Sequence, residues 1–327
     1  MKLLNQRKEK RFKLGLFFTN IETDYNKAAA STWIRIMQII EHYKALGVDV
    51  SVNNYFKHYD AAIIYRKSKR KYYWMLRFAK IISKRVYFDT CINLFDLNEE
   101  INEVRLKYAH KIAKHADGLI CASNQITRLA QPHCQSVFTF EDPVNLSYFK
   151  YTKKDINFDN PVFGWSGVSE KGYFLNRYAE EINNRIILIT DKNISTLKFQ
   201  YRFIKWDYNN FPKDLLNCDI ALLPRVYDDK YNSGHSSFKA LVFAVTGIPI
   251  IASKVPSYVD LAKYYDGIVF LEDNSDSIRE CIDVLRLRTL NTSRLKDYYS
   301  CQNQAKALIG YLKSNLSKSD KFPEIID

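Results

Sequence analysis

The sequence predicts an α/β protein with two Rossmann-like, doubly wound parallel sheets that face each other across a cleft. Short apolar runs alternate with helical stretches along the chain, as in parallel sheets covered by helices on both faces. The alternation is interrupted by the segment from Glu141 to Pro161, which is rich in Pro, Asn and Asp. The length of 327 residues also exceeds the size at which one core usually stops growing, which favours two domains.

The expected elements follow from the apolar runs and their breakers. In the first half we expect strands at Lys13–Phe18, Val48–Val52, Ala61–Tyr65, Arg85–Asp89, Gly118–Ala122 and Ser136–Phe140, and helices at Ser31–Leu46, Tyr72–Ser83, Glu99–His115 and Asn124–Gln131. In the second half we expect strands at Val162–Trp165, Arg185–Thr190, Tyr201–Lys205, Ile220–Pro224, Ile248–Ala252 and Ile268–Leu271, and helices at Tyr173–Asn183, Pro212–Asn217, Phe238–Val245, Ser275–Leu287 and Ser293–Ser314. These elements predict domains at 1–141 and 162–290, joined by a linker at 142–161 and followed by a helix and tail at 291–327.

Composition places the chain among globular cytoplasmic proteins. It has 46% hydrophobic and 26% charged residues with no biased tract. The first residues carry too many charges for a secretory signal, and no segment approaches the ~20 apolar residues that span a bilayer. The six cysteines show no C-x-x-C spacing, which suits reduced thiols and gives no metal signature.

The positive charge is concentrated in the first half. Residues 1–150 hold 25 Lys and Arg against 14 Asp and Glu, whereas residues 151–327 hold 24 against 22. A basic cluster at 66–71 precedes Tyr72, Tyr73 and Trp74, a composition that suits the anionic inner face of the cytoplasmic membrane or a lipid-phosphate acceptor. A solvated loop is the plain alternative. Single-stranded nucleic acid is a weaker one, because no RNA- or DNA-binding motif accompanies the charge, and we predict no nucleic-acid partner.

The segment from Asp219 to Ser257 predicts a phosphate site, because it reads as strand, long loop, helix, turn and strand. Ser236 and Ser237 stand where the helix would begin, and a helix start presents backbone N–H groups and the positive end of the helix dipole. Lys239 and Arg225 are near enough in sequence to add positive charge to a bound diphosphate. An ordinary βαβ unit with an empty helix start is the alternative interpretation.

Several of these pieces together resemble the GT-B fold nucleoside-diphosphate-sugar glycosyltransferases, in particular bacterial group 1 enzymes of surface polysaccharide assembly. The matching pieces are Gly164-Trp165-Ser166-Gly167, Cys218 to Pro224, Ser236 to Leu241 running into Thr246 to Ser253, and, in the first half, Ala116 to Ser123. The resemblance covers most of the chain, and it depends on the order and spacing of the pieces.

The resemblance implies an N-terminal acceptor domain, a C-terminal donor domain and a terminal helix that crosses back to the first domain. It places the donor diphosphate between the Gly167 loop and the start of the helix at Phe238, with Lys239 neutralising charge on the leaving nucleotide. The full expected donor set is Gly167, Lys171, Arg225, Gly234, His235, Ser236, Ser237 and Lys239. Lys171 is equally read as part of a helix-start turn, and His235 as an exposed loop histidine.

One departure from the family concerns its carboxylates. Many retaining members carry two glutamates eight positions apart, where this chain has Gly234 and Val242. The stereochemical outcome therefore stays open, and a non-catalytic descendant is an alternative. We expect no metal or other cofactor, since Lys239 and Arg225 supply positive charge and no Asp-x-Asp pair lies beside the loop. The adjacent Asp228 and Asp229 suit a solvated turn.

The acceptor side needs a group that accepts a proton from a hydroxyl. Asp89 closes a first-half strand and is predicted as this base, or else as a cap of the following turn, with Glu22 and Asp24 as weaker rivals. Thr19, Asn20 and Arg35 are predicted to hold the acceptor, although Arg35 also suits the surface. Trp206 and Tyr208 follow a strand and either stack on the nucleobase or pack in the core.

We therefore predict an enzyme that transfers a sugar from a nucleotide-sugar donor, its co-substrate, to a glycan or lipid-linked acceptor in bacterial surface polysaccharide synthesis. Asp89 and Lys239 are its predicted catalytic residues. The alternatives are a catalytically silent scaffold subunit, or a polyol-phosphate transferase or nucleotide-sugar epimerase on the same fold. The sequence does not specify the donor sugar, the nucleobase, the acceptor or the oligomeric state.

Overall fold

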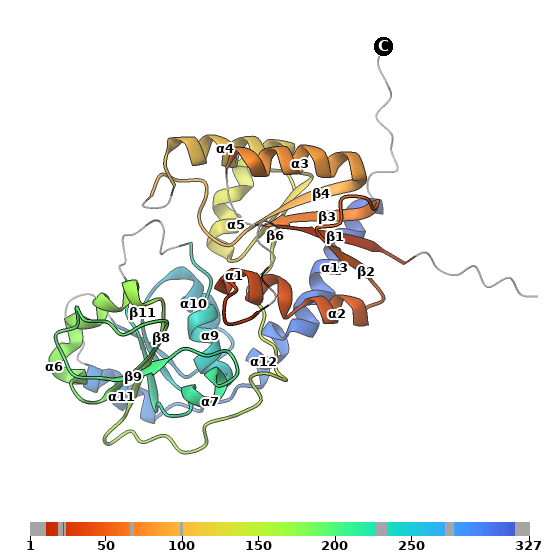
Figure 1. Ribbon diagram of the computed structural model, residues 1–327. Helices are drawn as coiled ribbons and strands as arrows, with labels where there is room; N and C mark the ends of the chain where they lie inside the picture. The colour runs from red at the N-terminus through yellow and green to blue at the C-terminus, as the bar shows by residue number, and fades with distance from the viewer. Residues whose placement is uncertain are drawn as a thin grey trace, which may run out of the picture.

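The computed structural model describes residues 11–18, 22, 24–65, 69–98, 101–225, 230, 234–271 and 278–317. It contains two six-stranded sheets, one before and one after the irregular segment near residues 142–161, and every strand pair is parallel (Figure 1). The predicted fold class, α/β with two doubly wound halves, is confirmed.

The first sheet has the strand order β2-β1-β3-β4-β5-β6. Its strands are β1 (Lys13–Phe17), β2 (Asp49–Val52), β3 (Tyr59–Tyr65), β4 (Ser83–Thr90), β5 (Gly118–Cys121) and β6 (Val137–Thr139). The central strands β1, β3 and β5 are almost entirely buried, because helices cover both faces of a parallel sheet. Each agrees with an expected strand to within two residues at either end.

Helices on opposite faces of this sheet form two separate cores. On one face lie α3 (Arg70–Ile82), α4 (Glu103–His115) and α5 (Asn124–Ala130), followed by the 3₁₀ turn η2 (Gln131–His133). On the other face lie α1 (Ala30–Thr32), the π-helix η1 (Trp33–Met37), α2 (Ile40–Ala45) and the C-terminal α13 (Cys301–Ser317). Figure 1 shows α3 and α4 above the sheet, with α2 and α13 below it.

The second sheet has the order β12-β11-β10-β7-β8-β9. Its strands are β7 (Phe163–Gly167), β8 (Ile186–Thr190), β9 (Arg202–Lys205), β10 (Ile220–Leu223), β11 (Ile250–Ser253) and β12 (Ile268–Leu271). Its helices are η3 (Ser169–Tyr178, 3₁₀), α6 (Ala179–Ile182), α7 (Phe211–Leu215), α9 (Phe238–Val245), α10 (Pro256–Ala262), α11 (Ile278–Arg286) and α12 (Ser293–Tyr299). Every residue of α9 except Lys239 is buried, so this helix holds the middle of the second core.

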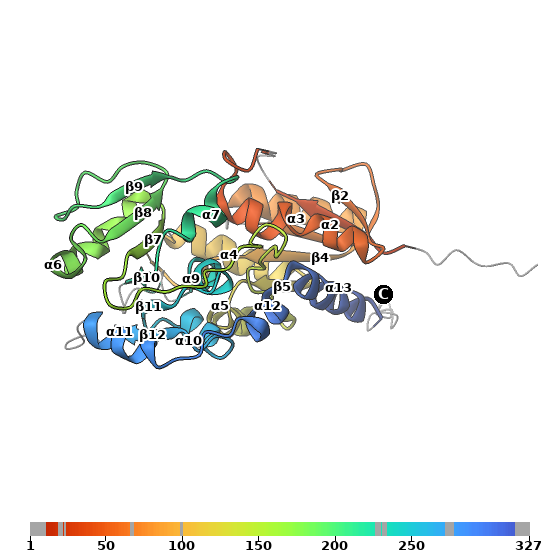
Figure 2. The same ribbon diagram turned by 90° about the horizontal axis from the view of Figure 1, so that it is seen from below.

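Two segments cross between the halves and are joined to each other. Val144, just after the first half, donates its backbone N–H to Tyr299 O at 2.8 Å, and Cys301 N–H donates back to Val144 O at 3.0 Å. Ser300, with φ −58° and ψ 141°, interrupts the predicted helix Ser293–Ser314. Helix α13 then returns to the first half (Figure 2). Its Ala305, Leu308 and Leu312 belong to the core that α13 shares with α2.

Three further stretches of the chain differ from the prediction. No helix was expected at α10, yet Pro256 occupies its first turn, where a missing N–H costs nothing. The expected helix at Tyr173–Asn183 is a 3₁₀ helix from Ser169 that becomes α-helical at Ala179. The expected helix Ser31–Leu46 is divided by η1, in which four consecutive residues from Trp33 are buried because it lies between the two halves. Residues 99, 100 and 275–277 of two further expected helices lie outside the described residues.

Candidate active site

The ammonium group of Lys239 lies at the C-terminal edge of the second sheet. Lys239 is in the first turn of α9, and its Nζ lies 4.3 Å from the ring centroid of Trp165 on β7. Gly167, at the end of β7, leaves the space that the ammonium uses, since a Cβ atom there would be 2.6 Å from Lys239 Nζ. Among the described residues no carboxylate forms an ion pair with Lys239. The site is therefore electropositive.

Further cations act on Lys239 and on each other. Burial lowers the pKa of Lys239, and the charges of Arg225 and Lys171 lower it further, to well below its ordinary value. Burial, Arg225, Lys171 and Lys239 likewise lower the pKa of His235 well below its ordinary value. Arg225 follows β10 and is held by Tyr258, whose hydroxyl accepts from Nε at 3.1 Å. A bound anion would relieve the repulsion among these cations, because it would offset their charge at short range.

The start of α9 is tied to the first half of the chain. The Ser236 hydroxyl donates to Asp142, and it accepts from Phe238 N–H at 3.5 Å. Ser237, the N-cap residue of α9, makes no side-chain cap. Ser123, from the first half, donates its hydroxyl to Gly234 O at 3.2 Å. A Cβ atom on Gly234 would lie 2.8 Å from Asn93 Cβ, so the two halves meet closely there. Ser236 and Gly234 therefore hold the start of α9 against the first half.

Arg35 lies at the centre of a buried ion cluster in the first half. Its Nη2 is 2.6 Å from Asp89 Oδ2, and its Nε donates to Asp89 Oδ1 at 3.0 Å. Its Nη1 contacts Asp142 Oδ1 at 2.5 Å and donates to Phe140 O at 2.9 Å. All three side chains are buried, so the expectation that Arg35 suits the surface is wrong. Arg35 satisfies two carboxylates, and Asp142 connects it to Ser236 just before α9.

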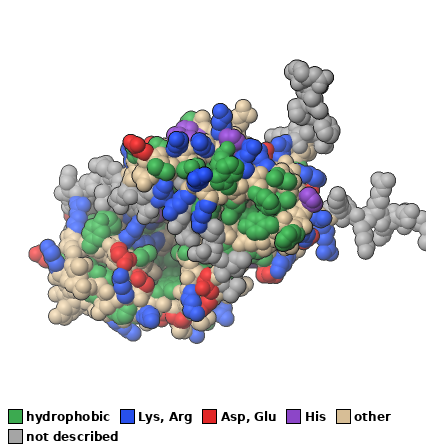
Figure 3. Space-filling view, turned by 45° about the horizontal axis from the view of Figure 1, so that its top comes forward, with side chains coloured by type: hydrophobic (Ala, Val, Ile, Leu, Met, Phe, Trp, Pro, Cys, Tyr) green, Lys and Arg blue, Asp and Glu red, His purple; other side chains and the backbone are tan. Residues whose placement is uncertain are grey.

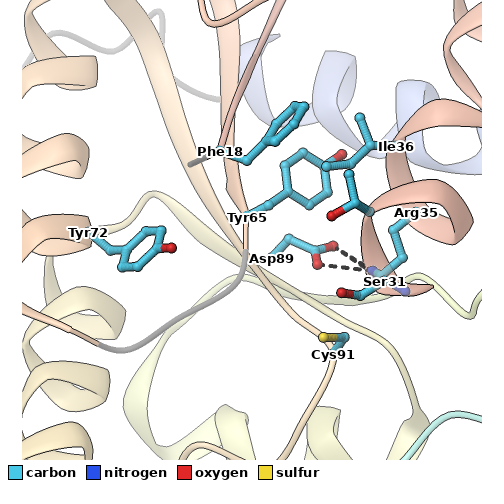
Figure 4. Close-up of a pocket in the computed structure, with 9 residues that line it drawn as sticks. Phe18, Ser31, Arg35, Ile36, Tyr65, Tyr72, Asp89 and Cys91 are labelled. Carbon is cyan, nitrogen blue, oxygen red and sulfur yellow. Dashed lines mark hydrogen bonds and ion pairs between the residues drawn. The ribbon is translucent and has the colours of Figure 1, made fainter. Parts of the chain in front are cut away.

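The cluster opens into a small pocket of the first half. Nine residues line it (Figure 4): Arg35, Ile36 and Asp89, together with Phe18, Ser31, Thr32, Tyr65, Tyr72 and Cys91. The hydroxyls of Ser31 and Tyr65 are buried and have no hydrogen-bond partner among the described residues. Burial raises the pKa of Asp89 above its ordinary value, although Arg35 opposes this. Unpaired buried hydroxyls are costly, and the pocket has room for about one water molecule, so Ser31 and Tyr65 can hydrogen-bond a water or a single hydroxyl group there.

An aromatic cluster joins the two halves beside the site. Tyr208 stacks on Tyr25 with ring centroids 4.2 Å apart and on Tyr148 at 4.3 Å. Trp33 packs against Trp206 and against Phe238. Both faces of the Tyr208 ring are thus covered by tyrosines, which favours packing over nucleobase stacking for this residue.

The remaining predicted residues are placed as follows. Thr19, Asn20, Asp228 and Asp229 lie outside the described residues. Glu22 accepts from Asp24 N–H and Asp24 pairs with Lys27, so both carboxylates make local contacts within residues 22–27. Asp89 pairs with Arg35 instead of capping a turn, and His235 is half-buried instead of exposed. Val242, at a family glutamate position, is buried inside α9.

Four polar residues of this region were not expected from the sequence: Glu141, Asp142, Ser31 and Tyr65. Asp142 and Glu141 follow β6 as Asp89 closes β4, so position at a strand end was the signal that they shared with Asp89. Ser31 and Tyr65 carry no such signal, because a hydroxyl beside an apolar run is commonplace.

Neither a metal-binding cluster nor a membrane-spanning helix is present among the described residues. They contain no group of three or more His, Cys, Asp or Glu side chains arranged to hold a metal ion. No helix among them has the length and apolar character needed to cross a bilayer.

Comparisons with known proteins identify the fold. No protein-family model matches the sequence, and no curated protein matches it either. Among solved structures, sucrose-phosphate synthase from Thermosynechococcus elongatus gives a TM-score of 0.71 at 13% identity, covering 95% of this chain and 100% of that chain. AviGT4, a glycosyltransferase involved in avilamycin A biosynthesis, gives 0.61 at 8% identity, covering 94% and 98%.

A third neighbour was solved with ligands. HepE from Anabaena, in complex with UDP-glucose, gives a TM-score of 0.58 at 10% identity and covers 95% of this chain and 100% of that chain. At these identities the likeness concerns the fold. The chain therefore has the GT-B fold, the two facing Rossmann-like domains that it shares with these glycosyltransferases.

Proposed function

We propose that this protein transfers a sugar from a nucleoside-diphosphate-sugar donor to a hydroxyl of a glycan or lipid-linked acceptor, in the synthesis of a bacterial surface polysaccharide. The observation that carries the proposal is Lys239: a cation at a sheet edge, unpaired with any described carboxylate and surrounded by Arg225 and Lys171. HepE supports it, since that neighbour was solved with UDP and with UDP-glucose.

The donor half would stabilise the leaving group. When the bond between the anomeric carbon and the β-phosphate oxygen breaks, its electron pair stays on the phosphate, and negative charge grows there. Before the reaction Arg225 is held by Tyr258 and Lys239 lies over the ring of Trp165, so they would stabilise this charge more than they stabilise the bound donor. An anion would also raise the pKa of Lys239 and keep it protonated.

The first half would bind and activate the acceptor. Ser31 and Tyr65 would hydrogen-bond a single hydroxyl group of a sugar at the pocket of Figure 4. The attacking hydroxyl forms the new bond to the anomeric carbon, and its proton passes to Asp89 or to a phosphate oxygen of the leaving group. Because its pKa is raised, Asp89 would accept a proton more readily than an ordinary carboxylate does. Arg35 keeps the carboxylate oriented.

Donor binding by Lys239→Ala tests the proposal. We expect calorimetry to show UDP or UDP-sugar affinity reduced roughly 10- to 100-fold, the value of one lost charged hydrogen bond. Lys263→Ala is the matched control, because Lys263 is an exposed lysine of the same half that pairs with Asp260. A Lys239→Ala protein that binds nucleoside diphosphates as tightly as the control would refute the donor site.

A silent scaffold subunit is the second candidate. Two observations favour it: Gly234 and Val242 replace the family glutamates, and Arg35 occupies both oxygens of Asp89. Release of free sugar from the donor by purified protein separates the candidates. Hydrolysis that Asp89→Asn abolishes supports the enzyme, whereas donor binding without turnover, with any acceptor tested, supports the scaffold.

A further inference from the structure

We propose that the outer face of α3 binds the surface of an anionic phospholipid bilayer. This inference rests on the proposed function, because it supplies the reason for a lipid surface near the acceptor pocket. It is carried by an exposed apolar stripe, by the charges around that stripe, and by the position of α3 beside the pocket.

The apolar stripe is formed by Trp74, Phe78 and Ile81. Their spacing of four and three residues places them on one face of α3. Their exposed fractions are 57%, 43% and 74%, which is unusual for side chains of this size. The turn before β3 extends the stripe: Phe56 is fully exposed at 100%, and Tyr55 packs on Phe78 with ring centroids 5.7 Å apart. This face also has a shallow open depression, which is lined by Tyr55, Lys71, Trp74, Met75 and Phe78.

The helices that carry and flank the stripe are strongly basic. Helix α3 contains four Lys and Arg residues and no acidic residue: Arg70, Lys71, Arg77 and Lys80. The adjacent α4 contributes Arg105, Lys107, Lys111 and Lys114 against the single acid Glu103. Figure 3 looks onto this part of the molecule and shows Lys and Arg side chains beside hydrophobic ones. Such a surface attracts anionic lipid headgroups and inserts its aromatic side chains at the interface.

A bilayer fits this face better than a nucleic acid does. Ile81 and Phe78 would gain by leaving water for the acyl boundary, whereas an aliphatic side chain gives a base nothing on which to stack. The first turn of α3 also joins this face to the pocket, since Tyr72 lines the pocket while Lys71 and Trp74 are exposed. A lipid-linked acceptor would therefore reach the pocket from the bound bilayer.

The test is co-sedimentation of the full chain with phosphatidylcholine vesicles that either contain or lack phosphatidylglycerol. We expect binding to the anionic vesicles, weakened at least tenfold by Trp74→Ser, Phe78→Ser and Ile81→Ser combined. Lys71→Gln with Arg77→Gln should weaken it about 25-fold, taking roughly fivefold for each charge. The matched controls lie in the other half and should bind as the wild type does: Val284→Ser on α11 with Leu287→Ser just after that helix, both exposed apolar residues, and Lys198→Gln with Lys205→Gln.

The outcomes separate this inference from the proposed function. Three results would overturn the bilayer site. They are no binding to anionic vesicles, vesicle binding that is unchanged in both α3 variants, and α3 variants that lose binding to single-stranded RNA but keep binding to vesicles. UDP-sugar affinity, measured by calorimetry on the same proteins without vesicles, reports on the donor site alone. If the protein binds vesicles but no nucleotide-sugar, the proposed function is refuted and the bilayer site is supported.

Discussion

Arg35 and Asp89, 54 residues apart in sequence, form a buried two-point ion pair, in which Nη2 and Nε of the arginine contact both carboxylate oxygens. The same arginine holds Asp142, and Asp142 accepts from Ser236 just before α9. The pocket of Figure 4 and the start of α9 are therefore linked through three side chains. Movement of one half against the other would have to break or stretch this chain of contacts.

The first prediction concerns Arg35→Gln. The substitution leaves the buried carboxylates of Asp89 and Asp142 without a cation, so we expect a loss of about 3–5 kcal/mol in the free energy of unfolding. Urea denaturation measures it. Lys44→Ala is the control, since the exposed Lys44–Glu41 pair should contribute less than about 1 kcal/mol. Equal losses in the two variants would contradict a structural role for the buried pair.

The second prediction concerns Gly167→Ala. The added methyl would lie 2.6 Å from Lys239 Nζ, and the flexible lysine would have to leave its place over Trp165. We expect nucleoside-diphosphate affinity to fall roughly tenfold or more, with little change in melting temperature. Gly310→Ala, at a helical site with no atom within 4 Å of the new methyl, should keep full affinity. Unchanged affinity in Gly167→Ala would remove the Lys239 position from the donor site.

The third prediction concerns the pH dependence of stability. Burial raises the pKa of Glu141 to about 7, from 4.5 in the unfolded chain, although Tyr298 and Tyr299 oppose the shift. The folded state then binds the proton more tightly, so this group's stabilising contribution is complete below pH 4.5 and is lost as pH rises through 7. Glu141→Gln mimics the protonated acid. It should match the wild type near pH 4.5 and exceed it by up to ~3 kcal/mol at pH 8.

Urea titrations at several pH values between 4.5 and 8 test this expectation. A difference between Glu141→Gln and the wild type that stays the same across this pH range would mean that the carboxyl of Glu141 is ionised in the folded protein without cost.

The fourth prediction concerns Tyr208→Ala at the junction of the halves. The ring stacks between Tyr25 and Tyr148, so its removal should cost about 2–3 kcal/mol and loosen the contact between the halves. Limited proteolysis of the segment near residues 142–161 should become faster. Tyr173→Ala, at an exposed ring that packs on its neighbour Phe174, should leave the cleavage rate unchanged.

The strands of both sheets were predictable because each is a short apolar run between turn residues. β10 and β11 show this most clearly: Ile220–Leu223 and Ile250–Ser253 are wholly buried, and their sequences leave few alternatives. α10 was missed because Pro256 was not recognised as a helix start. The interruption at η1 depends on packing against both halves at once, which no local pattern records.

The sequence by itself determined the two doubly wound halves and the cations Lys239 and Arg225 at the edge of the second sheet, because alternation and helix starts are local properties. Tertiary structure alone decided that Arg35 is buried between Asp89 and Asp142, and that the Ser236 hydroxyl donates to Asp142. These partners lie 54 to 107 residues apart, and in water each polar group could have bonded to solvent instead. Burial removes the water, so the fold selects the partner.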